Sequence, residues 1–145
     1  MTKVVPVLLA AWLGAACFFS FVVAPAAFKA FPRPEAGRYL GTIFPVYYIL
    51  GLVFSAATAA LLAQELKTPP PAPRFMLRLG LVCVVFLCMT FSMSFLKQIH
   101  AMREMLATAR TPELEAKFGR AHGISMSLNL LAILSALAAL VLELI

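Results

Sequence analysis

The sequence predicts an all-α fold, specifically an integral membrane four-helix bundle made of two helical hairpins. Three observations predict this class: the chain is 63% hydrophobic, only 12% of its 145 residues are charged, and the charged residues leave four long uncharged stretches. A soluble domain is about half apolar and about a quarter charged. We therefore expect lipid to surround most of this chain.

Each uncharged stretch is close to or above the length that a helix needs to cross a bilayer. A helix rises ~1.5 Å per residue, so about 20 apolar residues cross a hydrocarbon layer of ~30 Å. Arg78 and Lys97 bound the shortest stretch, and their long side chains can extend to the interface. The predicted spans are approximately 4–28, 40–64, 76–97 and 122–143.

The first and second spans each contain a proline, Pro25 and Pro45. A proline removes one backbone hydrogen bond and tends to bend a helix. We predict a helix kink at each of them. Packing is the simpler purpose of such a kink, and the alternative is a hinge or an exposed carbonyl that lines a polar pocket.

A proline-rich linker at 68–73 joins the two hairpins. Consecutive prolines lack amide donors and hold the backbone extended, so this linker is expected to be a short, rigid spacer. Such a spacer favours one membrane domain, residues 1–145, over two independent ones.

The other two loops are predicted to contain cytoplasmic helical segments, over 33–39 and 97–121. Pro34 and Glu35 suit a first helical turn, where a missing amide is harmless and a negative charge complements the helix dipole. Thr111 is placed to cap the fourth helix.

Basic residues in the short loops predict the orientation of the chain. The side of the membrane with more Lys and Arg usually faces the cytoplasm. Four basic residues lie on the side of the N-terminus and the linker, and eight on the side of loops one and three. We expect a cell (inner) membrane protein with both termini outside and loops one and three cytoplasmic. The net charge of +6 suits anionic lipid headgroups, and no nucleic acid partner is expected because a basic soluble face is missing.

His122, Ser125 and Asn129 form the main candidate site. At i, i+3 and i+7 they share one face of the fourth helix. An Asn in hydrocarbon is unfavourable unless it is hydrogen-bonded, so this face must meet other helices or water. Hydrogen bonding between helices is the simpler purpose, and a polar path or a ligand site is the alternative. His100 lies on the same side of the membrane and can approach His122.

Sulfur side chains gather in the third span. Cys88, Met89 and Met93 are weak candidates for a soft metal ion such as Cu(I), which prefers thiolate and thioether ligands. Cys and Met also fill irregular gaps in apolar cores, and the sequence contains no CxxC or HxxxH motif. We therefore predict no metal and no cofactor.

Acidic residues are too few and too peripheral for ordinary acid/base catalysis. All six acidic residues are Glu, and all lie at or beyond the ends of the predicted spans. No pair of buried carboxylates is therefore available. The sequence predicts that the chain is not an enzyme.

Several segments of the chain together resemble a known family. They are, in order, Trp12–Gly14, Ala24–Phe28, Glu35–Gly37, Ile43–Tyr48 and Phe118–Ser125, followed by Asn129. They resemble the TMEM205-like family of small membrane proteins, which carry the DUF4149 domain, over nearly the whole chain. The resemblance implies a four-helix membrane domain and special roles for Pro25, Gly37, Pro45, His122 and Asn129. It implies no reaction.

Two functions fit these observations. Stripes of Gly, Ala and Ser on the spans let helices approach closely, which is how helices associate in lipid. The first hypothesis is a non-enzymatic accessory or scaffold subunit that packs against a larger membrane complex, with other membrane protein subunits or further copies of itself as partners. The alternative is a small oligomeric transporter or exporter of a soft metal ion or an organic solute, with His122, Ser125 and Asn129 along its path.

Overall fold

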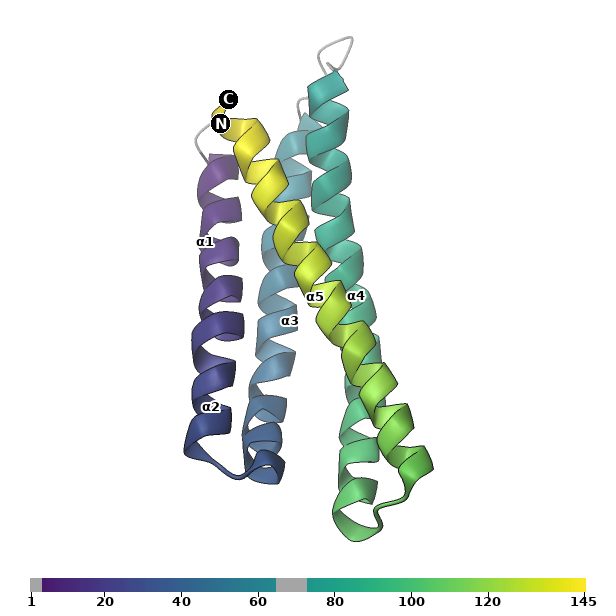
Figure 1. The fold of residues 1–145 in the computed structure, drawn as a ribbon. Helices are drawn as coiled ribbons and strands as arrows, with labels where there is room; N and C mark the ends of the chain where they lie inside the picture. The colour runs from purple at the N-terminus through teal and green to yellow at the C-terminus, as the bar shows by residue number, and fades with distance from the viewer. Residues whose placement is uncertain (1–3, 65–72) are drawn as a thin grey trace.

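The structure is a computed structural model that describes residues 4–64 and 73–145, and nearly all of this length is helical. The elements, in chain order, are α1 (Val4–Phe18), the π-helical turn η1 (Phe19–Val23), α2 (Ala24–Ala30), α3 (Arg33–Ala63), α4 (Pro73–Thr108) and α5 (Pro112–Leu144). Because α1, η1 and α2 follow one another without a break, they form one rod, and the described chain consists of four long rods (Figure 1).

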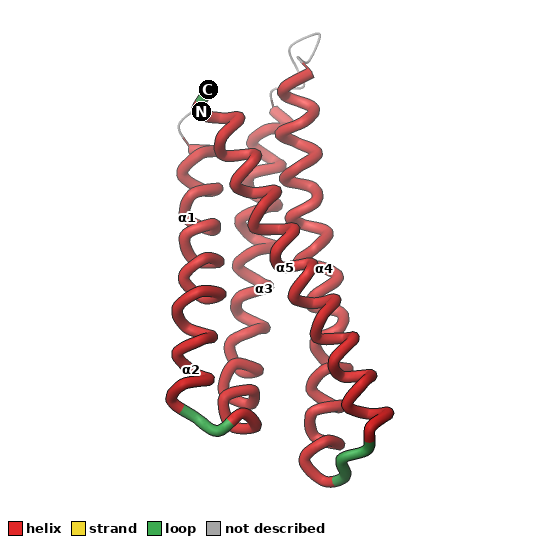
Figure 2. Tube along the Cα trace, viewed as in Figure 1, coloured by secondary structure: helices red, strands yellow, loops and turns green. Residues whose placement is uncertain are grey.

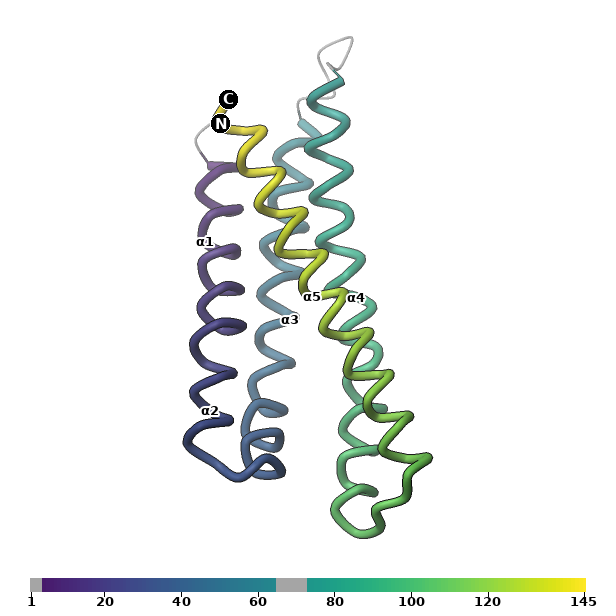
Figure 3. Tube along the Cα trace, viewed as in Figure 1, coloured from purple at the N-terminus to yellow at the C-terminus, as the bar shows by residue number. Residues whose placement is uncertain are grey.

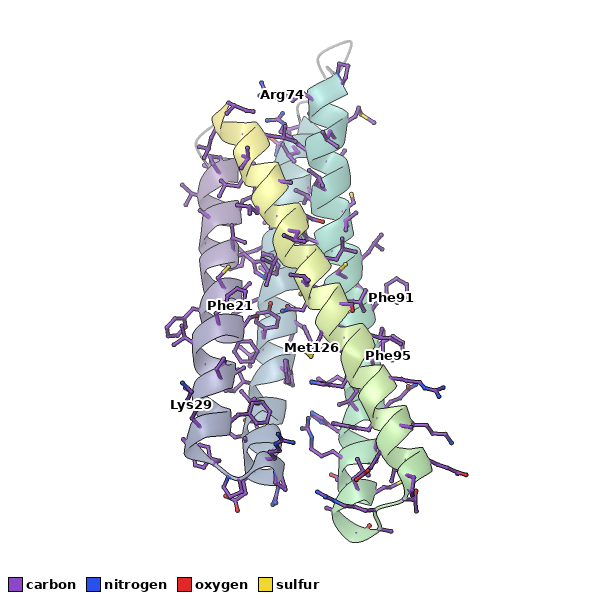
Figure 4. The ribbon with its side chains drawn as sticks, viewed as in Figure 1. Phe21, Lys29, Arg74, Phe91, Phe95 and Met126 are labelled. Carbon is purple, nitrogen blue, oxygen red and sulfur yellow. The ribbon has the colours of Figure 1, made fainter. Side chains whose placement is uncertain are left out.

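Each rod is long and apolar enough to cross a membrane. Large apolar side chains are exposed along their outer surfaces, among them Phe21, Phe91 and Met126. Figure 4 shows Phe21 and Phe91 projecting outward at opposite sides of the bundle, between Lys29 near one end and Arg74 near the other. Lipid is the solvent that suits this surface. The chain is thus a multi-pass membrane protein, and the predicted all-α four-helix bundle is confirmed.

The rods pack in a ring, in which each rod contacts its neighbours in chain order and α5 closes onto α1. The α4–α5 hairpin has the most extensive contact, α3 packs on α4, and α1 packs on both α3 and α5. Figure 3 shows α5 running obliquely, against α4 near their connecting loop and toward α1 near the chain termini. Figure 2 places the loops 31–32 and 109–111 at one end of the bundle, here called the loop end, and both termini at the other, here called the terminal end.

The π-helical turn η1 has its cause in Pro25. Proline has no amide hydrogen, so the carbonyl four residues earlier, that of Phe21, loses its helical partner. The backbone widens just upstream, where the amide of Ala24 bonds the carbonyl of Phe19, five residues earlier. At Pro45, by contrast, α3 continues as one helix. The predicted kinks at these prolines stay predictions.

The loops match the helix signals in the sequence. Residues 33–39 form the first turns of α3, and the carbonyl of Pro32 accepts hydrogen bonds from the amides of Glu35 and Ala36. At the other loop, the hydroxyl of Thr111 accepts from the amide of Leu114 at 3.3 Å, which confirms the predicted cap. In the predicted segment 97–121, the helix breaks only at residues 109–111. Of the predicted linker, Pro73 begins α4 and 68–72 lie outside the described residues.

Three rods come into close contact at Gly51 on α3. A Cβ at this position would lie 2.7 Å from the Met89 sulfur on α4 and 2.9 Å from the Trp12 indole nitrogen on α1. All three residues are buried. Gly51 therefore permits the close helix packing that drives association in lipid.

Candidate functional site

Asn129 links α5 to the two rods of the first hairpin. The Tyr47 hydroxyl on α3 donates a hydrogen bond to Asn129 Oδ1 at 2.5 Å, and Asn129 Nδ2 donates to Ser20 Oγ in η1 at 3.1 Å. Both ends of the amide thus have a partner. The widened turn upstream of Pro25 places Ser20 where this bond can form.

Ser125 makes a second link one turn earlier on the same face of α5. Its hydroxyl lies 3.2 Å from that of Tyr48, and both residues are buried. The tyrosine rings are held by neighbours, since Tyr47 stacks on Phe19 and Tyr48 on Phe44 at centroid distances of 4.9 and 5.6 Å. Ser125 and Asn129 therefore face the bundle interior as paired groups.

A few buried polar atoms lack such pairing. Trp12 Nε1 and Ser92 Oγ have no hydrogen-bond partner among the described residues. A cavity of about 10 Å³ lies beside Trp12, with Ser55 and Thr58 in its wall. That volume is near the lower limit for one water molecule. It is far smaller than a site for an organic solute.

A second polar group, here called the loop-end cluster, consists of Gly37 and Gly41 on α3, His100 and Arg103 on α4, and Phe118 and His122 on α5. Arg103 Nη1 donates to the carbonyl oxygen of Gly37. The guanidinium carbon lies 5.9 Å from the centroid of the Phe118 ring, and His122 stacks nearly parallel on that ring, with a centroid distance of 5.9 Å. The Arg103 side chain on α4 thus contacts both α3 and α5.

His100 completes the cluster on the α3 side. Its Nε2 atom is buried and has no hydrogen-bond partner in the part of the chain that the structure describes. A Cβ at Gly41 would lie 3.1 Å from this nitrogen and 2.8 Å from Arg103 Nη1, and one at Gly37 would lie 3.3 Å from Arg103 Nε. The two glycines therefore leave the space that Arg103 and His100 occupy.

The predicted approach of His100 to His122 takes an indirect form. No hydrogen bond or ring contact joins the two imidazoles within residues 4–64 and 73–145. Both are instead neighbours of Arg103 or of its aromatic partner Phe118. Arg103 was not among the predicted site residues, although it follows Leu96 and Ile99 at helical spacing and so falls on the packed face of α4.

Comparison with known proteins identifies the family. The model for a domain of unknown function, DUF4149, matches residues 7–108, which is more than half of the chain. The chain belongs to the DUF4149 family. It is also 31% identical to a protein of Aquifex aeolicus (strain VF5), described as an "Uncharacterized protein", over 91% of this chain and 88% of that protein. No solved structure matches.

The DUF4149 match includes most of α1 and all of η1, α2, α3 and α4, and it ends before α5 begins. Gly37, Gly41, His100 and Arg103 therefore lie within the matched range. Ser125, Asn129 and the aromatic side of the loop-end cluster lie beyond it.

The three sulfur residues that were weak metal candidates in this DUF4149 protein take part in apolar packing. Cys88 and Met89 are buried, and Met93 packs on the same core from a partly exposed position. Met89 contacts the tight junction at Gly51. In the described ranges no three His, Cys, Asp or Glu side chains come together in a way that could hold a metal ion.

An ion pair fastens the terminal end of the bundle. Arg78 Nη1 on α4 lies 2.7 Å from Glu143 Oε1 on α5, and the two side chains are 16% and 8% exposed. Arg78 thus binds a carboxylate of its own chain at the place where we expected it to extend toward the interface. This contact ties α4 to α5 far from the loop end.

Proposed function

We propose that this DUF4149 protein is a non-enzymatic accessory or scaffold subunit of the cell (inner) membrane, which packs against other membrane proteins. One observation carries the proposal: the polar side chains that face the interior near Asn129 and Ser125 bond to one another. Polar groups that are satisfied in this way hold helices together. They leave few free donors or acceptors for chemistry.

The positions of the carboxylates support the non-enzymatic part of the proposal. Among the described Glu residues, those at 35, 104, 113 and 115 are exposed at the loop end. Glu143 is paired with Arg78 at the terminal end. A general acid or base needs to reach a substrate within an enclosed site, and none of these carboxylates faces the middle of the bundle.

The surface of α1 supports a lateral partner. Its small residues Ala10, Ala11, Gly14 and Ala15 are exposed, and a Cβ at Gly14 would meet nothing within 4 Å. Small residues on a lipid-facing surface allow another helix to approach closely. We propose that a membrane-spanning helix of another protein packs there. We also propose that the chain is TMEM205-like, on the segments named above, and that its loop end lies in the cytoplasm, on the excess of Lys and Arg at that end.

Gly14→Ile tests this role, and Gly80→Ile is a matched control because a Cβ at Gly80 also meets nothing within 4 Å. The protein is purified in a mild detergent from native membranes, and co-purifying subunits are identified by mass spectrometry. We expect Gly14→Ile to lose them and Gly80→Ile to keep them. A wild-type protein that is monomeric and without partners, or that forms only homo-oligomers, would contradict the proposal.

A small oligomeric transporter or exporter of an organic solute or a soft metal ion is the second candidate. It is favoured by the buried nitrogen or oxygen atoms of Trp12, Ser92 and His100, which lack partners in the described part of the chain. Flux into proteoliposomes that falls in Asn129→Leu and His122→Ala would support it. Flux that is unchanged in both variants would exclude these residues from a path.

A further inference from the structure

The charge of Arg103 is only partly compensated by the protein. The side chain is half-buried, and within the described residues its one hydrogen bond is to the carbonyl of Gly37. A guanidinium has five N–H donors. Among the described residues, no carboxylate lies within 4.0 Å of the Arg103 guanidinium. The ion pair that the structure shows there joins Arg78 and Glu143. Arg103 therefore has both charge and donors left for an anion.

His100 adds a second nitrogen beside Arg103, next to Gly41. His100 Nε2 and Arg103 Nη1 lie 3.1 and 2.8 Å from the position that a Cβ at Gly41 would take. The imidazole nitrogen is buried and lacks a partner among the residues described. A buried polar atom without a partner is costly. With its proton on Nε2, His100 can donate to an anion that also accepts from Arg103.

The third side of the cluster is aromatic. Phe118 lies beneath the guanidinium of Arg103, and His122 stacks on Phe118. A cation over an aromatic face is attracted to the ring, and the bond to Gly37 also restrains the guanidinium of Arg103. A guanidinium held in a fixed plane can present two parallel N–H groups to the oxygens of a phosphate.

The loop-end cluster lies at the depth where lipid headgroups are expected. Its residues lie at or just beyond the predicted span ends at 40, 97 and 122, at the end of the bundle that also carries the exposed Arg38 and Arg120. Basic pockets between helices at this depth are suited to lipid phosphates.

We propose that the loop-end cluster is a phosphate-binding site, with Arg103 and His100 as the donors and the headgroup of a membrane phospholipid as the phosphate source. This inference goes beyond the accessory role and does not depend on it. A protein that failed to bind partners would still bind phosphate here.

The test measures lipid binding to the detergent-purified full chain by native mass spectrometry, with phosphatidylglycerol as the probe and phosphatidylcholine as the comparison. We expect Arg103→Gln to weaken phosphatidylglycerol binding about tenfold or more, the loss expected for a hydrogen bond to a charged group. Arg110→Gln removes the same charge from an exposed position at the same end, and it should change binding less than about twofold. Equal losses in the two variants would show general charge attraction and overturn the proposal.

Inorganic phosphate distinguishes the two sources of the anion. If it displaces phosphatidylglycerol from the wild type but not from Arg103→Gln, the site is supported and accepts soluble phosphate too. If it does not displace a lipid whose binding depends on Arg103, the lipid source is supported. If neither ligand depends on Arg103, the site does not exist.

A second variant covers the case in which Arg103→Gln does not fold. His100→Gln removes the other nitrogen beside Gly41 and leaves the guanidinium in place. We expect about a threefold loss of phosphatidylglycerol binding, the size of a weaker hydrogen bond. Unchanged binding in this variant would overturn the role of His100 and the two-donor site.

Discussion

Replacing Asn129 with leucine is expected to destabilise the bundle by about 1–3 kcal/mol. The amide makes two hydrogen bonds, at 2.5 Å from Tyr47 and at 3.1 Å to Ser20. A hydrogen bond between membrane helices contributes about 0.6 kcal/mol on average, so the two bonds together contribute about 1 kcal/mol. Tyr47 is only 6% exposed, and its unpaired hydroxyl would add to this loss.

The free energy of unfolding is measured in mixed micelles with increasing SDS, with circular dichroism as the readout. Ser127→Leu is the control, because Ser127 is exposed on the same helix and its loss should change stability by less than about 0.5 kcal/mol. A double-mutant cycle with Tyr47→Phe isolates the Tyr47–Asn129 bond, and we expect a coupling energy of about 0.5–1.5 kcal/mol. A coupling near zero would refute the argument that this pair holds α3 to α5.

Three further variants test other contacts by the same unfolding assay. Gly51→Ala should destabilise the bundle by about 1–3 kcal/mol because its Cβ would overpack the junction, and Gly80→Ala should be neutral or stabilising; equal effects would contradict this. Glu143→Gln should cost about 1–3 kcal/mol by weakening the charge-assisted bond between Glu143 and Arg78, and a stability equal to wild type would show that the pair contributes nothing. Thr111→Ala should cost about 0.5–1 kcal/mol through loss of the cap; an unchanged midpoint would refute the cap's contribution.

The fold could be predicted from the sequence because lipid imposes a simple rule. A segment that crosses the hydrocarbon must satisfy its own backbone, and a long uncharged stretch can do so only as a helix. Charges such as Arg78 and Lys97 then mark where a crossing segment ends. The packing order of the rods was not predictable in this way, because apolar helices offer several faces of similar hydrophobicity.

For the hydrogen bonds inside the bundle, the sequence predicted only the residues on α5. Helical spacing placed Ser125 and Asn129 on one face of α5, but it named neither Tyr47 nor Tyr48 as their partners. Adjacent residues on a helix point about 100° apart, so the pattern alone gives no reason for both tyrosines to meet α5. The direction of Ser20 depends on the π-helical turn, which shifts the helical register and is invisible to a regular periodicity.

Arg103 shows a different limit of sequence reasoning. A cation beyond the end of a span is ordinarily a solvated surface residue, and Arg103 was not named as a site residue. Its partial burial depends on Gly37 and Gly41 lying opposite it on α3. That register between two helices is a tertiary property, which neither composition nor spacing records.

Because α5 runs obliquely, it contacts α4 and α1 and links the two hairpins (Figure 1). It is tied to α4 by Glu143 at one end and carries Phe118 beneath Arg103 at the other, while Asn129 between them is bonded to η1 and α3. The two hairpins therefore cannot separate unless the bonds at Asn129, the Tyr48–Ser125 contact and the Arg103–Gly37 bond all break. Any large rearrangement that moves one hairpin against the other would therefore have to exchange polar contacts at both the middle and the loop end of the bundle.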